Sequence, residues 1–284
     1  MIVLLLLAAA PVSASDEPGL DPRAEACVSR FEAAWSKVRT LRFNMVKRER
    51  LRNGRVIKEE IGVKLRRPKT LYVAQLRPRR GQEAIYDPAR DRDEVLAHPG
   101  RFPDFTVSLD LYGSYATKDQ HHPVDHIGYD YTLGVVRTLI GWAQSAKYGE
   151  RFEYLGSVER DGEVLEHVRF VGGKAPWRHV TARDDESVFD LAKRVGADPY
   201  LIYYYNRSLD DYSDELDEGT SYRIPPYYSP SLDLWFSSRS QLLVRMEAKD
   251  YEGRRYEDYR YTNMAVNPRL TDRDFDPDNP EYNF

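Results

Sequence analysis

The first third of the chain changes from a helical to a two-residue pattern of apolar positions. A helix is expected over residues 22–40, because an aspartate that can cap it precedes a proline and apolar residues then recur at helical spacing. From Leu41 apolar and polar residues alternate, and Asn53-Gly54 suits a tight hairpin turn because both residues tolerate positive φ. Strands are therefore predicted at 41–52, 57–66, 71–76 and 84–86.

The rest of the chain again gives a helix followed by strands. The second helix is expected from Pro123 to Gly149, with apolar residues along one side. Asp161-Gly162 is a tight-turn pair between two alternating segments. Strands are predicted at 152–159, 164–171, 232–237, 242–249 and 255–262. Residues 270–284 are acidic and interrupted by prolines, so a tail is expected there.

Helices flanked by hairpins predict an α+β fold, with a curved antiparallel half-barrel sheet wrapped around helices. Every second residue of such a sheet faces its concave side. Apolar residues on that side either line a pocket of the size of a lipid chain or pack on the helices. The residues expected on this apolar concave face are Ile61, Val63, Leu65, Val73, Leu234 and Phe236.

A small inserted domain is expected between two stretches rich in glycine and proline. Gly172-Gly173 and Pro176 precede the segment and Pro225-Pro226 follow it, as at the joins of an inserted domain. The expected organisation is a signal peptide at 1–15, a host domain formed by 20–175 and 227–284, and an insert at 176–226.

The N-terminus has features of a secretory signal. The apolar run from Ile2 to Ala10 is shorter than the about 20 residues that span a bilayer. Val12-Ser13-Ala14 resembles a cleavage site, although no basic residue precedes the run. We expect an exported protein of the bacterial periplasm or cell envelope that is not an integral membrane protein. The lone Cys27 lies on the apolar stripe of the first helix, so it should fill the core.

Charge is unevenly distributed, although the formal net charge is only -4. Between Lys37 and Arg80 there are 16 basic residues and three acids, whereas between Thr181 and Tyr222 there are 11 acids and four bases. The basic stretch suits an anionic partner such as lipid, and export argues against nucleic acid. Two other interpretations stay open: solvated faces, or two parts of one molecule that attract each other.

The segment from His179 to Pro226 resembles a LysM module, a small βααβ domain that binds glycans containing N-acetylglucosamine. Asp185-Glu186-Ser187 stands where that family has the turn that caps its first helix, and Gly219 and Ile224-Pro225 match its closing strand. The resemblance implies a contact with peptidoglycan or a related glycan between the first turn and the loop after the second helix. The implied glycan-binding residues are Arg183, Asp184, Asp185, Glu186, Ser187, Asn206, Arg207, Ser208 and Leu209.

Two departures from the LysM pattern leave a second interpretation open. Asp185 replaces the turn glycine, and the loop after Leu209 is long and acidic, which would repel muramyl carboxylates. A degenerate module that makes a protein contact and binds no ligand is therefore the alternative. The tyrosines that crowd this segment, such as Tyr203–Tyr205, either stack on sugars or pack between insert and host, and packing is the favoured interpretation.

The remainder of the chain, residues 24–172 and 228–284, resembles the LolA-like periplasmic lipoprotein carriers. More specifically, it resembles an uncharacterised family of exported bacterial proteins near those carriers. The matching pieces are His121-His122-Pro123 with Gly128, and the ending from Asp274 to Phe284. The resemblance implies a half-barrel whose concave face holds a lipid or the acyl chain of a lipoprotein.

The sequence contains no pattern that predicts catalysis, a cofactor or a metal site. His122 and His126 have i, i+4 spacing, but Pro123 follows His122 where a zinc protease needs glutamate. Paired carboxylates such as Asp210-Asp211 lie in polar runs and not in an apolar cleft. A non-enzymatic exported binding protein is therefore predicted. A structural or protein-interaction module is the alternative, and a cell-wall hydrolase is favoured least.

Overall fold

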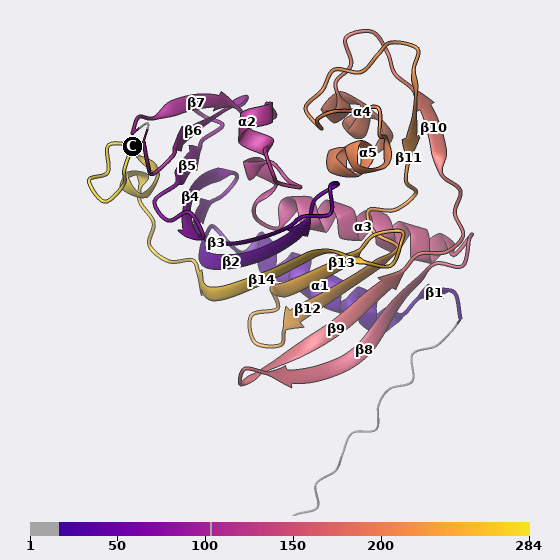
Figure 1. Cartoon of the computed structure of the whole chain (residues 1–284). Helices are drawn as coiled ribbons and strands as arrows, with labels where there is room; N and C mark the ends of the chain where they lie inside the picture. The colour runs from indigo at the N-terminus through magenta and orange to yellow at the C-terminus, as the bar shows by residue number, and fades with distance from the viewer. Residues whose placement is uncertain (1–16, 103) are drawn as a thin grey trace, which may run out of the picture.

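A twelve-stranded sheet that curls around two helices dominates the computed structural model, which describes residues 17–102 and 104–284 (Figure 1). All neighbouring strands are antiparallel except β1 and β8, which are parallel. The predicted α+β class with a curved antiparallel sheet is confirmed. The predicted signal peptide lies outside the described residues.

The strand order in the sheet is β1-β8-β9-β12-β13-β14-β2-β3-β4-β5-β6-β7. Their bounds are β1 (Gly19–Leu20), β2 (Thr40–Arg50), β3 (Val56–Arg66), β4 (Thr70–Arg77), β5 (Glu83–Tyr86), β6 (Glu94–His98), β7 (Val107–Asp110), β8 (Arg151–Arg160), β9 (Glu163–Val171), β12 (Ser231–Ser237), β13 (Leu243–Lys249) and β14 (Arg255–Val266). β6 and β7 were not predicted from the sequence.

The helices are few, and those within residues 176–226, the segment called the insert from here on, are short. They are α1 (Pro22–Ser36), α2 (Ser114–Thr117), the 3-10 turn η1 (Val124–His126), α3 (Asp130–Ser145), α4 (Val188–Val195), α5 (Pro199–Tyr205) and the 3-10 turn η2 (Asp272–Phe275). Within the described ranges, no helix combines the length and the apolar character needed to cross a membrane.

Packing of α1 and α3 on the sheet forms the main core. Asp21 caps α1, and the ring of Phe31 packs 5.3 Å from Phe236 and 5.1 Å from Tyr129, centroid to centroid. The buried Tyr129 hydroxyl donates to the carbonyl of Leu243 at 2.6 Å, so its polar atom is satisfied inside the core. Cys27 is buried in the same cluster, as expected.

The second helix is shorter than the sequence suggests. The chain forms only a 3-10 turn after Pro123, and Gly128 then adopts a φ of 102°, which interrupts the helical path. A side chain there would also meet Leu65. Regular α-helix therefore begins at Asp130, and it ends at Ser145 because Ala146 is left-handed. The predicted bounds of Pro123 and Gly149 were wrong for this reason.

The C-terminal segment packs on the sheet and is not a free tail. The ring of Tyr282 stacks on Tyr72 with centroids 3.9 Å apart. Lys64 donates to Asp274 and to the Tyr282 hydroxyl, both at 2.8 Å. Figure 1 shows the C-terminus beside the ends of β5 to β7. The segment therefore covers the outer face of the sheet at these strands.

The segment predicted as an insert folds around its own small core. Its two strands, β10 (Arg178–Thr181) and β11 (Ser221–Ile224), pair antiparallel and enclose α4 and α5. The order is thus β10-α4-α5-β11. Ser187 caps α4 in a reciprocal capping box with Asp190, and Gly196 ends it in a left-handed conformation.

The close backbone contact at Gly173, just after β9, gives a test of the packing between this join and the turn before β8. A Cβ on Gly173 would lie 2.1 Å from the carbonyl oxygen of Tyr148, so backbone would have to move. We expect Gly173→Ala to destabilise the fold by roughly 1–3 kcal/mol. The control Gly141→Ala meets open space within α3 and should stabilise it by up to about 1 kcal/mol. Chemical denaturation of both variants measures the difference, and equal effects would contradict the packing argument.

Candidate ligand cavity

A cavity of about 530 Å³ lies inside the curl of the sheet, between strands β3 to β7 and the segment that contains α2 and η1. We call it the barrel cavity. Its size falls within the range of about 300–1,000 Å³ that is common for sites that bind small molecules. It is lined by Lys47, Glu59, Ile61, Val73, Gln75, Gln82, Glu83, Ala84, Val95, Ala97, His98, Pro99, Phe105, Val107, Leu109, Tyr115, Ala116, Gln120, Val124 and Ile127.

Small side chains on the inner face of the sheet leave this space open. Strand register places Val63, Val73, Ala84, Ala97 and Val107 in one continuous row across five strands. Alternate residues of a strand point to the same face, so the row faces inward throughout. Alanine at two central positions cannot reach the opposite wall, and a floor of short apolar side chains results.

Polar groups of the cavity gather at one end of the strands. Gln75 pairs with Ile61 in the sheet, and the backbone of Gln75 bonds to Gln82. These polar residues lie on the side of the loops 78–82 and 99–106. The cavity is therefore apolar along its floor and polar toward this end.

The predicted concave-face residues divide between the cavity and the core. Ile61 and Val73 line the barrel cavity. Val63 and Leu65 are buried, and Leu65 packs beside Gly128. Leu234 and Phe236 are also buried, on strand β12, where Phe236 packs on Phe31 of α1. The structure thus brings two of the six to the cavity and four to the core.

Lys47 forms a buried ion pair in the wall of the cavity. Its Nζ lies 2.9 Å from Glu59 and 3.5 Å from Glu49, and it donates to the Gln120 side chain at 3.0 Å. Burial alone would lower the pKa of Lys47, but the charges of the two glutamates outweigh burial and raise it. Lys47 belongs to the basic stretch that is expected to meet solvent or an anionic partner, and instead it lies inside the barrel.

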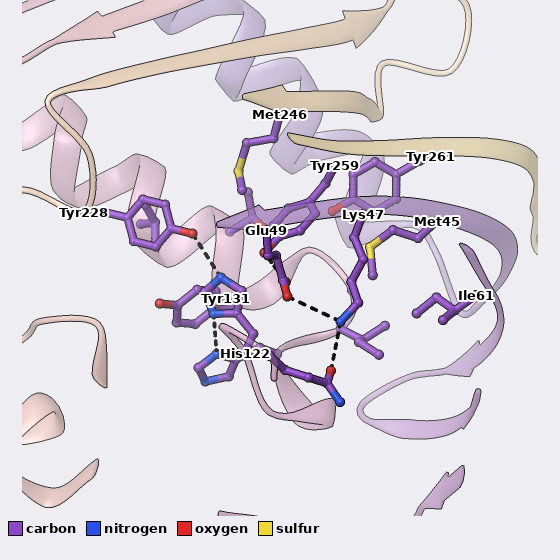
Figure 2. Close-up of a pocket in the computed structure, with 16 residues that line it drawn as sticks. Met45, Lys47, Glu49, Ile61, His122, Tyr131, Tyr228, Met246, Tyr259 and Tyr261 are labelled. Atoms are coloured by element: carbon purple, nitrogen blue, oxygen red, sulfur yellow. Dashed lines mark hydrogen bonds and ion pairs between the residues drawn. The ribbon is translucent and has the colours of Figure 1, made fainter. Parts of the chain in front are cut away.

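A second, smaller pocket of about 60 Å³ continues beyond Lys47 (Figure 2). It shares Lys47, Ile61, Gln120 and Ile127 with the barrel cavity. Figure 2 shows His122, Tyr131, Tyr228 and Tyr259 around it, and the ion pair between Lys47 and Glu49.

Glu257 is fully buried beside this second pocket and accepts three hydrogen bonds. His121 Nδ1 lies 2.7 Å and His122 Nε2 3.1 Å from one carboxylate oxygen, and the Tyr228 hydroxyl donates to the other. The other ring nitrogen of His121 lies 3.0 Å from the carbonyl oxygen of Arg50. The His121 ring is thus held between Glu257 and the backbone of β2. We call these residues, with Asp198, the Glu257 cluster.

The insert contributes Asp198 to this cluster. Asp198 caps α5, accepts a hydrogen bond from the Tyr131 hydroxyl and lies 3.6 Å from His122 Nδ1. Burial raises the pKa of Asp198, although the charge of His122 opposes the shift. The insert and the barrel are therefore joined by charged groups that are shielded from water.

The pKa values of His122 and His126 are shifted in opposite directions. Burial alone would lower the pKa of His122, but the charge and hydrogen bond of Glu257 outweigh burial and raise it to about 9. Burial would raise the pKa of Glu257, yet the neighbouring His122 and His121 hold it far below its ordinary value. His126 has no such partner, so burial and the charge of His122 lower its pKa well below the usual value.

Arg52 of the basic hairpin makes a second contact between the host and the insert. Its guanidinium donates to the carbonyls of Tyr203, Asn206 and Leu209, the last at 2.6 Å, and lies 3.9 Å above the Tyr203 ring. Cations suit the C-terminal end of a helix, where carbonyls are unpaired. The Tyr200 ring also stacks on His121 with centroids 4.1 Å apart. The tyrosines of the insert therefore pack against the host.

The residues implied in glycan binding fall into two groups. Glu186 pairs with Arg194, Ser187 caps α4, and Leu209 is buried in the core of the insert. The Asn206 amide bonds to the backbone of Ile202 and Arg223, so its side chain fixes the loop. The other implied residues are exposed: Arg183, Asp184, Asp185, Arg207 and Ser208.

A polar cleft of about 460 Å³ separates the insert from the hairpin of the host. Arg207 lines this cleft together with Tyr203, Tyr212 and Lys118. The Tyr212 hydroxyl is buried and has no hydrogen-bond partner among the described residues. The cleft therefore offers the exposed guanidinium of Arg207 to a polar ligand.

Sequence reasoning missed the barrel cavity's outer strands and the Glu257 cluster. No group of three or more His, Cys, Asp or Glu side chains in the described ranges has the geometry of a metal site. Cys27 is buried, and burial followed by the nearby Glu166 charge raises the pKa of its thiol to about 11, so the thiolate is disfavoured.

Comparison with protein families gives one match, to the family described as "Protein of unknown function (DUF1571)". The family model matches residues 38–164 and 220–284, which together are more than half of the chain. These ranges include every residue that lines the barrel cavity. A search of curated proteins finds no match.

Solved structures of similar fold share little sequence with the chain. A LolA superfamily protein from Nitrosomonas europaea has 10% identity and a TM-score of 0.33, covering 89% of this chain and 97% of that one. Lipoprotein LppX from Mycobacterium tuberculosis has 10% identity and a TM-score of 0.41, covering 88% and 98%. A DUF1329 family protein from Desulfovibrio piger has 9% identity and a TM-score of 0.37, covering 89% and 96%. At these values the matches carry no information on ligands or partners.

The raised pKa of His122 predicts a pH-dependent contribution to stability. The folded pKa of about 9 exceeds the ordinary value of 6.5, so the contribution is complete below about pH 6.5 and is lost as pH rises through about 9. The shift corresponds to at most about 3 kcal/mol. The difference in Tm between wild type and His122→Gln should therefore shrink from pH 6 to pH 10. The exposed His179→Gln serves as control, and a difference that does not vary with pH would refute the assignment.

Proposed function

Since the chain belongs to the DUF1571 family, and the family match contains the whole barrel cavity, we propose that the cavity is the binding site of this protein. The proposed ligand is the acyl chain of a lipid or lipoprotein. The protein holds this chain without catalysing a reaction. The proposal places it outside the cytoplasm, in the periplasm or cell envelope.

The enclosed row of short apolar side chains is the observation that carries this proposal. Val73, Ala84, Ala97 and Val107 leave an extended apolar floor that no side chain of the described residues fills. Each methylene group that moves from water into such a space contributes about 0.8 kcal/mol. A ligand with a long alkyl chain therefore gains the most from this shape, whereas a compact polar ligand gains little.

The polar end of the cavity suits the head of an amphiphile. Gln75, Gln82 and Gln120 offer neutral donors and acceptors there, and Lys47 with Glu59 adds a paired charge. An apolar chain on the floor would therefore leave its ester, amide or hydroxyl group among hydrogen-bonding side chains. This arrangement fixes the direction of the chain, with its methyl end away from the loops 78–82 and 99–106.

The insert supports a second candidate function, a contact with cell-wall glycan through a LysM-like module. Its order β10-α4-α5-β11 agrees with the βααβ pattern of that family. Asp185, which replaces the family's turn glycine, has a φ of 51°, so the turn keeps a left-handed residue despite the substitution. The proposed contacts are the exposed Arg183 and Asp184 at the turn and Arg207 in the polar cleft.

Filling the cavity tests the proposed acyl-chain site. We expect a dansyl-labelled fatty acid to bind the wild type with enhanced fluorescence. Ala97→Phe places a ring on the floor and should weaken binding at least about tenfold, or about 1.4 kcal/mol. Ala89→Phe, in the exposed loop between β5 and β6, is the matched control and should bind as the wild type does. Thermal unfolding verifies that both variants are folded. No binding by the wild type, or equal binding by both variants, would reject the site.

Co-sedimentation with purified peptidoglycan sacculi tests the glycan contact. The wild type should pellet with sacculi, and Arg183→Ala combined with Arg207→Ala should remain in the supernatant. Both side chains are exposed, so the fold is expected to survive the change. Arg160→Ala, on the distant β8, is the control. A wild type that stays in the supernatant would favour the alternative, a structural or protein-interaction module whose LysM-like segment binds no ligand.

A further inference from the structure

Exposed aromatic side chains are confined to one short part of the described chain. Phe102 is 94% exposed, Phe105 55%, Tyr112 36% and Tyr115 82%. These are the exposed phenylalanine, tyrosine and tryptophan residues among those described, and they flank β7 on both sides. Apolar rings exposed together in this way indicate an interaction surface and not ordinary surface composition.

This aromatic group surrounds the opening of the barrel cavity. Phe105 and Tyr115 both line the cavity, although both are exposed to solvent, so they mark where it reaches the surface. Figure 1 shows α2, which carries Tyr115, beside the end of β7. The polar end of the cavity faces the loop 99–106, and this loop carries Phe102 and Phe105.

Arginines adjoin the aromatic rings at this opening. The loops 78–82 and 99–106 touch, because a Cβ on Gly100 would lie 2.2 Å from the carbonyl carbon of Gly81. This contact brings the exposed Arg79 and Arg80 next to the exposed Arg101. Arg79 lies 3.7 Å from Glu59 of the cavity wall, which fixes it at the rim. We define the mouth patch as Arg79, Arg80, Arg101, Phe102, Phe105 and Tyr115.

The charge of the mouth patch is positive and largely unneutralised. Arg80 and Arg101 form no ion pair within the described residues. The nearest acid in the loop, Asp104, lies 3.2 Å from His98 Nε2. The guanidinium groups of Arg80 and Arg101 therefore face outward beside apolar rings, and this composition is complementary to anionic lipid headgroups above an apolar layer.

From this juxtaposition we infer that the mouth patch docks on the surface of an anionic phospholipid membrane. The rings enter the headgroup region, where aromatic side chains are favoured, and the arginines contact lipid phosphates. Each basic residue near such a surface contributes about 1 kcal/mol. Docking directs the cavity opening at the bilayer, so an acyl chain can pass between them without crossing water. The inference rests on the proposed function and adds the partner from which the cavity is loaded.

Vesicle flotation tests the docking. The full mature chain should float with phosphatidylcholine vesicles that contain phosphatidylglycerol and much less with phosphatidylcholine alone. Phe102→Ser combined with Phe105→Ser should lower the bound fraction on the order of tenfold. The control is Val158→Ser combined with Val164→Ser, which removes two exposed apolar side chains from the hairpin of β8 and β9. This control should float as the wild type does.

Charge reversal separates the two parts of the patch. Arg80→Glu combined with Arg101→Glu should abolish the preference for phosphatidylglycerol while the protein remains folded, because both side chains are exposed. Raising the salt concentration should likewise weaken the flotation of the wild type with vesicles that contain phosphatidylglycerol. A wild type that does not float, or a control pair that lowers flotation as much as the phenylalanine pair, overturns the inference.

The dansyl fatty acid assay distinguishes failure of the docking from failure of the proposed function. Fatty acid binding without flotation would reject the membrane surface and retain the cavity. Flotation without fatty acid binding would reject the acyl-chain site and leave the mouth patch as a membrane contact. The arginine pair should keep its fatty acid affinity, since neither residue lines the cavity.

Discussion

The buried carboxylate of Glu257 is the constraint on which the central part of the structure depends. A charged group removed from water is costly unless donors surround it, and here His121, His122 and Tyr228 supply them. These donors come from two separate segments, the stretch before η1 and the stretch after the insert, and β14 carries the acceptor. Satisfying one carboxylate therefore fixes where the cavity wall, the insert and the sheet meet. Asp198 extends the same requirement into the insert, since it also lies beside His122.

The size of the inward side chains decides which part of the sheet is filled and which is hollow. Where β12 carries Phe236, the ring meets Phe31 of α1 and the space is closed. Where β5 and β6 carry Ala84 and Ala97, the side chains are too short to meet anything opposite. The same alternation and the same antiparallel pairing thus produce a packed core at one end and a cavity at the other. The outer face of the hollow part is covered by the C-terminal segment, so the strands there stay buried on that side without an α-helix.

The sequence predicted most of the strands because they are half-buried and alternate regularly, as in β2, β3, β8 and β9. It did not predict β6 and β7, which have five and four residues and lie in a polar stretch without a clear period. The bounds of α3 were wrong because the left-handed Gly128 interrupts an apolar pattern that continues through it. The Glu257 cluster could have been suspected, since Glu257 has the same strand parity as the buried Tyr259 and Tyr261. Its histidine partners could not, because no periodicity relates β14 to residues more than a hundred positions earlier.

The cavity and the insert are connected through the segment from α2 to η1. This segment forms one wall of the barrel cavity through Ala116, Gln120 and Val124, and its His121 and His122 belong to the Glu257 cluster. Arg52 and Tyr200 hold the insert against the same region from the hairpin side. A displacement of the insert would therefore separate Asp198 from His122 and leave charges without partners, which the buried surroundings oppose. The insert thus contacts the cavity wall through a small set of charged groups. The position of the insert therefore constrains the shape of the wall.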